Sequence, residues 1–265
     1  MRRLLAAGLM SFSLLASPAF AEQSATASAE PAAQFTPAQK TEIEAIVRNL
    51  LLTDPNLVAD ALDKVQEEMK AREAAATSEK IRANHDRIYD NGGLAIGGNP
   101  NGDVTIVEFF DYNCGYCRAA HQELKQLLSE DKNIRMIYRE FPILGPNSII
   151  ASRMALAAND QGKYLEMHDK LFSSSSQLNA DAMLKIAQDM GLNMTKVTAG
   201  ISDPNMLVSL RGTIDLATDL GIRGTPAFII GDKLFPGAMS LEQMRVAVAE
   251  ARAEAKNQPA KPANP

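Results

Sequence analysis

One stretch of the chain has the pattern of a strand that is buried on both faces, and a second stretch has the pattern of a strand. Residues 104–110 form an apolar run that only Thr105 and Glu108 interrupt. Residues 134–141 form a second strand-like run, which Pro142 ends. Hydrophobic runs without a polar face are typical of inner strands in a sheet that helices cover on both sides. The pattern therefore predicts an α/β domain around these two strands.

Helical patterns and a hairpin complete this domain, which we expect to span residues 91–257. A helix is predicted over about residues 117–128, and a helical insertion over about residues 143–221 with glycines at its helix ends. Residues 227–230 and 233–235 flank a Gly-Asp pair and indicate a β-hairpin. A last helix follows the hairpin.

A small all-α segment is predicted before this domain, over residues 35–90. The sequence Thr36-Pro37-Ala38-Gln39 combines an N-cap, a proline at the first helical position and the glutamine of a capping box, and Asp54-Pro55 begins a second helix. After each of these two predicted helix starts, apolar residues recur at helical spacing: Ile43, Ile46, Val47, Leu50, Leu51, Leu57, Val58, Ala61, Leu62, Val65 and Met69.

This apolar stripe needs a partner, because two helices of this size bury too little surface to be stable alone. It packs either on the rest of the chain or on other copies of itself. The charged, alanine-rich stretch over residues 70–89 resembles a spacer, which favours self-association. Residues 35–90 are therefore expected to be an oligomerisation segment.

The N-terminus has the plan of a secretory signal peptide. Two arginines precede an apolar run over residues 4–15, and Ser17-Pro18-Ala19-Phe20-Ala21 offers small residues at a cleavage site. We expect cleavage after Ala21, a flexible leader over residues 22–34 and a tail over residues 258–265. The alternative is an uncleaved N-terminal anchor. Cleavage predicts an exported, periplasmic protein in a compartment where disulfides persist.

Composition narrows the functional classes. The chain has 265 residues, of which 46% are hydrophobic and 22% charged, as in ordinary globular proteins. Its net charge of −5 argues against a nucleic-acid partner, because phosphate binding needs an excess of lysine and arginine. Two cysteines cannot build a four-thiolate structural zinc site. No metal site and no cofactor is expected.

The strongest chemical signal is Asn113-Cys114-Gly115-Tyr116-Cys117, between a buried strand and a helix. A cysteine at a helix N-terminus lies beside unpaired N–H groups and the positive end of the helix dipole, which favour its thiolate. A second cysteine one turn on can close a disulfide ring. We therefore expect Cys114 to be the exposed nucleophile and Cys117 a more buried resolving thiol. A Cu(I) site and a static disulfide are the alternatives.

The order of these elements resembles the thioredoxin fold. Strand, Cys-Gly-Tyr-Cys, helix, strand, helical insertion, then Thr225-Pro226 before a hairpin and a last helix is similar to the DsbA-like thiol–disulfide oxidoreductases, over about residues 98–256. The leading helices make the chain similar to the branch of the suppressor-of-copper-sensitivity protein C and Com1-like proteins. The resemblance implies a thioredoxin fold with a helical insertion.

The resemblance also assigns roles to site residues. It implies that Pro226 is the cis-proline beside the active-site sulfurs, and that Glu108 is a buried acid that takes the proton of Cys117. The alternative for Glu108 is a strand-edge position that faces water. The intervening Gly115-Tyr116 and the preceding Thr225 resemble the pattern of disulfide isomerases and reductases, whereas strongly oxidising members carry Pro-His and Val.

Other polar candidates are weaker. His121 is expected to be solvated or to pack between helices, and Arg118 either adds positive potential at Cys114 or lies alone on the surface. His85 and His168 fall in helical patterns and are interpreted as surface or packing residues. Core packing accounts for most of the methionines.

The sequence thus predicts an exported disulfide isomerase or reductase that acts on misoxidised proteins. The resemblance implies a membrane thiol reductase as electron donor and favours a homotrimer over a dimer. The alternatives are a dithiol oxidase that donates disulfides, a Cu(I)-binding protein and an oligomeric holdase.

Overall fold

The computed structural model describes residues 35–93, 95–174 and 178–257. The expected signal peptide, leader and tail therefore lie outside the described residues. The chain divides into two compact units, with the division between Ala61 and Leu62. In the described ranges, no helix is long and apolar enough to cross a membrane.

The first unit is helical. Helix α1 (Pro37–Thr53) begins with the expected capping box, in which Gln39 N donates to Thr36 Oγ1 at 3.3 Å and Thr36 N donates to Gln39 Oε1 at 2.9 Å. Helix α2 (Pro55–Ala83) starts directly after it. No residue of α1 is buried. The residues of its predicted apolar stripe have exposed fractions of 41–60%: Ile43, Ile46, Val47, Leu50 and Leu51.

The second unit contains a five-stranded sheet with the strand order β1-β3-β2-β4-β5. Its strands are β1 (Gly97–Gly98), β2 (Val104–Phe110), β3 (Ile134–Glu140), β4 (Ala227–Ile230) and β5 (Lys233–Pro236). The two predicted inner strands, β2 and β3, pair in parallel, and the other pairs are antiparallel. The hydrophobic pattern did not predict β1, because its two glycines carry no side chains to show one.

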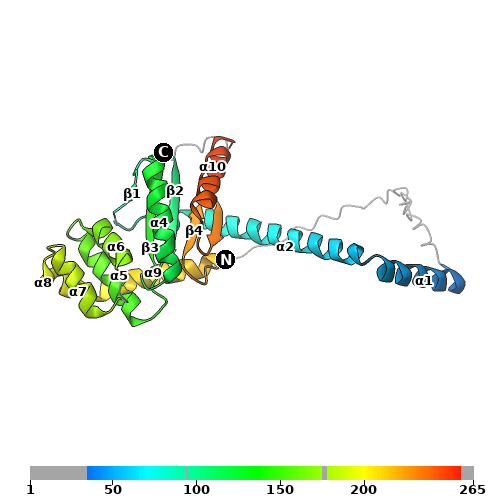
Figure 1. Ribbon diagram of the computed structural model, residues 1–265, viewed down its shortest axis with the longest axis horizontal. Helices are drawn as coiled ribbons and strands as arrows, with labels where there is room; N and C mark the ends of the chain where they lie inside the picture. The colour runs from blue at the N-terminus through cyan, green and yellow to red at the C-terminus, as the bar shows by residue number, and fades with distance from the viewer. Residues whose placement is uncertain (1–34, 94, 175–177, 258–265) are drawn as a thin grey trace, which may run out of the picture. The chain divides into compact units, whose positions relative to one another are not determined.

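Helices cover both faces of this sheet. Ile106 and Phe110 of β2 pack with helices α4 (Gly115–Glu130) and α10 (Leu241–Asn257), which lie against each other on one face (Figure 1). The intervening Val107 and Phe109 point to the opposite face. This two-sided burial is the reason why β2 has no polar face in the sequence.

The end of α2 belongs to the second unit. Ile81 of α2 and Ile88 of α3 (His85–Tyr89) are fully buried with Leu220 and Ile229 in the core of the second face. The stretch from Ile81 to Tyr89 therefore packs on the second unit and is not part of a spacer, whereas residues 70–76 are exposed. The boundary expected at residue 90 differs from the division that the structure shows at Ala61 and Leu62.

Five helices make up the insertion between β3 and β4. They are α5 (Pro146–Asn159), α6 (Tyr164–Ser173), α7 (Ala180–Asp189), α8 (Met194–Ser202) and α9 (Pro204–Leu220). Asn179 caps α7 through its side chain. Gly221 ends α9 in the left-handed conformation, in agreement with the glycines predicted at helix ends. The sequence pattern did not predict α8 as a separate helix, because its nine residues lie between two stronger helix signals.

Candidate active site

Cys114 is the N-cap residue of α4. Its sulfur accepts the N–H of Cys117 at 3.4 Å, and its own N–H donates to the carbonyl of Asp111 at 3.0 Å. A donor aimed at the sulfur from the first turn of a helix favours the anionic form of a thiol. The local sequence therefore places Cys114 where its sulfur can act as a nucleophile.

The two cysteines differ in burial in the expected order. Cys117 is fully buried, whereas Cys114 retains an exposed fraction of 7%. Cys114 is thus not the exposed side chain that we expected, because the segment before β4 lies over it. The Cys114 thiol donates to the carbonyl oxygen of Thr225 at 3.3 Å, and the following peptide bond to Pro226 is cis.

Glu108 lies inside the sheet and not at its edge. It is paired in register with Tyr138 of β3 and Phe228 of β4, and it is fully buried. Neither carboxyl oxygen has a hydrogen-bond partner among the described residues. Burial raises the pKa of Glu108 to about 8, and the nearby charges of Cys114 and Glu140 add to this shift. The carboxyl group therefore holds a proton at neutral pH.

Burial also raises the pKa of Cys117 well above its usual value, with the charge of Glu108 as the next cause. A thiol in this state does not ionise spontaneously at neutral pH. Cys117 can attack only if a neighbouring group accepts its proton. Glu108 interacts electrostatically with this thiol and is the buried acid in that position.

Asp111 holds two loops together, which the sequence analysis did not detect. Its Oδ1 accepts the N–H of Asn113 at 2.8 Å, and its Oδ2 accepts the N–H groups of Ile143 and Leu144, each at 2.9 Å. The fully buried carboxylate thus joins the turn before Cys114 to the loop after β3. The signal in the sequence that could have revealed this role is the position of Asp111, an acidic residue directly after a predicted strand.

Glu140 is the centre of a second buried network that the sequence analysis missed. Its Oε1 accepts the hydroxyls of Tyr112 at 3.0 Å and Tyr164 at 2.8 Å, and its Oε2 accepts Ser152 Oγ at 2.7 Å. Burial raises the pKa of Glu140 to about 7, against the opposing effect of these three hydrogen bonds. The network fastens helices α5 and α6 to the sheet beside the cysteine turn.

The remaining candidates are packing residues or lie away from the cysteines. His121 is buried with Nε2 2.9 Å from Asp169 Oδ1, and its ring stacks on Phe172. His168 is also buried, with Nδ1 3.1 Å from the Tyr112 hydroxyl, whereas His85 is exposed.

Arg118 is not a lone surface residue. Its guanidinium donates to the backbone carbonyls of Phe172 at 2.5 Å and Ser174 at 2.6 Å, so it ties α4 to the end of α6. Across the described part of the chain, three or more His, Cys, Asp and Glu side chains do not gather anywhere in the manner of a metal site.

Gly115 and Tyr116 form the accessible surface of the cysteine turn. Tyr116 has an exposed fraction of 73%, and a Cβ at Gly115 would meet no atom within 4 Å. Side chains at these two positions therefore face solvent and incoming molecules. They can influence the sulfur of Cys114 without disturbing the core.

A dithiol at a helix N-terminus opposite a cis-proline, on this mixed sheet, defines a thioredoxin-like protein. The family model of the DSBA-like thioredoxin domain matches residues 105–249. The chain belongs to this family and has the fold of a DsbA-like thiol–disulfide oxidoreductase.

Solved structures agree with this assignment. A thioredoxin-like oxidoreductase from Silicibacter pomeroyi is 42% identical over 63% of this chain and 97% of its own, with a TM-score of 0.61. The thiol-disulfide exchange protein alpha-DsbA2 from Wolbachia pipientis is 35% identical over 68% of this chain and 97% of its own, with a TM-score of 0.63. A linker-deletion mutant of Proteus mirabilis ScsC is 26% identical over 85% of this chain and 100% of its own, with a TM-score of 0.63.

The similarity to ScsC extends beyond the catalytic domain, consistent with the ScsC-like branch. Curated relatives include the Na(+)/H(+) antiporter NhaA 1 of Salinispora arenicola, which is 30% identical over 158 residues. These residues are 59% of this chain and 24% of the antiporter, so the chain spans about a quarter of the length of that relative.

Proposed function

We propose that this protein is an exported disulfide isomerase and reductase that acts on misoxidised proteins through Cys114 and Cys117. The observation that supports this most strongly is the environment of the Cys114 sulfur. It receives the N–H of Cys117 at the start of α4 and contacts the carbonyl of Thr225 next to Pro226. The sequence pattern of a signal peptide in residues 1–21 supports a periplasmic location.

The reaction begins when the Cys114 thiolate attacks a disulfide of the client protein. A bond forms between Cys114 Sγ and one client sulfur, the client disulfide breaks, and the second client sulfur leaves as a thiolate that takes up a proton. For isomerisation, a different client thiolate then attacks the mixed disulfide and releases Cys114. That route gives no net oxidation or reduction.

For reduction, the ionised fraction of Glu108, about one tenth at pH 7 for a pKa of about 8, accepts the proton of Cys117, and the Cys117 thiolate attacks Cys114 Sγ. The Cys114–Cys117 disulfide forms, and the client sulfur leaves as a thiol after protonation. The client gains two electrons and the protein loses two. A membrane thiol reductase must return them, and this donor is part of the proposal.

The direction of electron flow is supported by Gly115, Tyr116 and Thr225. These residues match the pattern that the family resemblance associates with isomerases and reductases. No histidine stands in the turn to stabilise the Cys114 thiolate, and a less stabilised thiolate makes the reduced form less favoured and the protein less oxidising.

Self-association is the second part of the proposal, with a trimer favoured. The apolar stripe of α1 is exposed, and a stripe of this kind is stable in water only when another surface covers it. Several Cys114 sites in one oligomer would raise their effective concentration around one client.

Thiol trapping in cells tests the direction of electron flow between this protein and its clients. Alkylation with a mass-shifting reagent should show Cys114 and Cys117 mostly reduced at steady state. A mostly oxidised pair would contradict the isomerase and reductase proposal and support an oxidase that donates disulfides.

Replacement of each cysteine tests the chemistry. Cys117→Ser should accumulate mixed disulfides with client proteins on non-reducing gels, because the resolving thiol is absent. Cys114→Ser should accumulate none. Equal trapping by both variants would contradict the assigned roles.

A further inference from the structure

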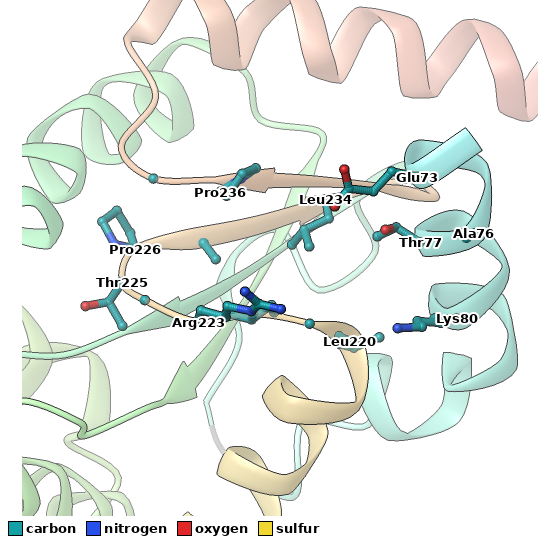
Figure 2. Close-up of a pocket in the computed structure, with 15 residues that line it drawn as sticks. Glu73, Ala76, Thr77, Lys80, Leu220, Arg223, Thr225, Pro226, Leu234 and Pro236 are labelled. Atoms are coloured by element: carbon teal, nitrogen blue, oxygen red, sulfur yellow. The ribbon is translucent and has the colours of Figure 1, made fainter. Parts of the chain in front are cut away.

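A cavity of about 570 Å³ lies between helix α2 and the segment that leads to Pro226. Figure 2 shows its two long walls, with Glu73, Thr77 and Lys80 on α2 and with Arg223 and Thr225 on the opposite segment. The volume is in the range of sites that bind small molecules or short peptide segments. Thr225, whose carbonyl contacts the Cys114 sulfur, is one of the residues that line this cavity.

The α2 wall is firmly attached to the sheet. Ile81, one residue after the last α2 residue that lines the cavity, is buried in the same core cluster as Leu220. Arg82 Nη1 also lies 3.1 Å from Asp232 Oδ2 at the turn between β4 and β5. The cavity is therefore bounded by elements of one compact unit.

Two cations of this cavity have no side-chain partner among the described residues. Lys80 and Arg223 make no side-chain hydrogen bond and no ion pair within the ranges that the structure describes, whereas Arg82 and Arg87 nearby are paired with aspartates. Figure 2 shows Arg223 between α2 and Thr225, and Lys80 directed from α2 toward the same segment.

The one acidic residue of the lining lies toward another part of the cavity. Glu73 precedes Lys80 by seven residues, which is about 10 Å along a helix. Figure 2 shows Glu73 beside Leu234, at the β5 side. Arg223 stands on the Thr225 side of the cavity and Lys80 faces it from the α2 side, so this end of the lining carries positive charge that is complementary to a carboxylate.

We propose that this cavity binds the segment of a client protein next to its reactive cysteine, and that Lys80 and Arg223 select an acidic side chain in that segment. This inference rests on the proposed function, because Cys114 must hold the client sulfur. Extended chain advances about 3.3 Å per residue. Since Arg223 is two residues from Thr225, the acidic residue is expected about two to four residues from the client cysteine.

Binding of cysteine-free peptides tests this inference without any exchange chemistry. Fluorescent peptides with serine in place of the cysteine, and with Asp, Asn or Lys three residues away, are titrated with the full-length protein at low ionic strength. Fluorescence anisotropy should show that the Asp peptide binds about five-fold tighter than the Asn peptide. This is the difference expected from two partly exposed charge pairs. The Lys peptide should bind weakest.

Charge variants assign the preference to the two cations. Lys80→Gln with Arg223→Gln should abolish the difference between the Asp and Asn peptides, and Lys80→Glu with Arg223→Glu should make the Lys peptide bind tightest. Arg211→Gln is the matched control, since Arg211 is an exposed arginine on α9 outside the cavity and should leave the preference unchanged. Equal binding of all peptides, or a preference that survives the double glutamine variant, would overturn the inference.

Exchange kinetics separate this inference from the proposed function. The same peptides with cysteine restored, as mixed disulfides with glutathione, should be reduced with a kcat/KM about five-fold higher for Asp than for Asn. Absence of exchange with every peptide, together with selective binding of the serine peptides, would contradict the proposed function and leave the binding site supported. Exchange at equal rates and equal binding would contradict only the acidic preference.

Discussion

The carbonyl oxygen of Thr225 lies 3.3 Å from the sulfur of Cys114, although 111 residues separate the two along the chain. The contact needs a thiol hydrogen, so it is lost when Cys114 ionises to a thiolate and is also absent in a mixed disulfide. In the proposed reaction, the Thr225 carbonyl is then free to accept a backbone N–H of the client. The proposal thus links activation of Cys114 to exposure of a group that can bind a peptide.

Tyr116→His should make the protein more oxidising. A histidine beside Cys114 stabilises the thiolate and therefore the reduced form, and the exposure of Tyr116 leaves room for the new ring. We expect the reduction potential to rise by about 30 mV or more, equivalent to about 1.4 kcal/mol for this two-electron couple. Equilibration with glutathione buffers measures it. Tyr116→Phe is the control, and an unchanged potential in Tyr116→His would contradict the assigned tuning role.

Glu108→Gln should change the pH dependence of stability. The pKa of Glu108 is raised from 4.5 to about 8, so its stabilising protonated form is lost as the pH rises through that range. The folded protein binds more protons than the unfolded one there, and its free energy of unfolding falls. The variant lacks this loss and should gain stability relative to wild type between pH 5 and pH 8, by roughly a few kcal/mol.

Urea unfolding at several pH values measures this difference. Glu79→Gln is the control, since Glu79 is exposed on α2, and it should follow the wild-type pH dependence. Glu108→Gln should also slow resolution of the mixed disulfide, because the variant lacks the ionised carboxylate fraction that we propose as the acceptor of the Cys117 proton. A parallel pH profile for variant and wild type would contradict the buried, protonated state of Glu108.

Asp111→Asn should weaken both the fold and the exchange reaction. Its carboxylate accepts three backbone N–H groups from two loops, and an amide in that place leaves part of this set without an acceptor. We expect a loss of about 1–3 kcal/mol in the free energy of unfolding and slower reduction of peptide disulfides. Asp203→Ala removes the helix cap of α9 and should reduce stability by about 1 kcal/mol without slowing exchange. Equal rates for both variants would contradict the positioning role of Asp111.

Leu50→Glu should dissociate the proposed oligomer. Leu50 belongs to the exposed apolar stripe of α1, and a buried carboxylate at an interface is strongly disfavoured. Light scattering after gel filtration should show a monomer, with peptide reduction retained and isomerisation of a scrambled protein reduced. Asn49→Glu adds the same charge on α1 and should leave the mass unchanged. A wild-type monomer at micromolar concentration would contradict self-association.

The sequence determined the parts of this protein that depend on local patterns. An apolar run predicted β2, and a strand pattern ended by Pro142 predicted β3. Capping residues and glycines predicted most helix ends, since these signals depend on neighbours in the chain. The Cys-Gly-Tyr-Cys spacing and the strand before it were enough to place a dithiol at a helix N-terminus.

Tertiary structure decided what depends on contacts between distant residues. The burial of Cys114 follows from Thr225, the clamp by Asp111 from a loop 32 residues away, and the Glu140 network from helices of the insertion. The attachment of Ile81 to the sheet follows in the same way, because an alanine-rich charged stretch does not reveal which single face it buries. Such contacts depend on which elements become neighbours, and no local pattern encodes that choice.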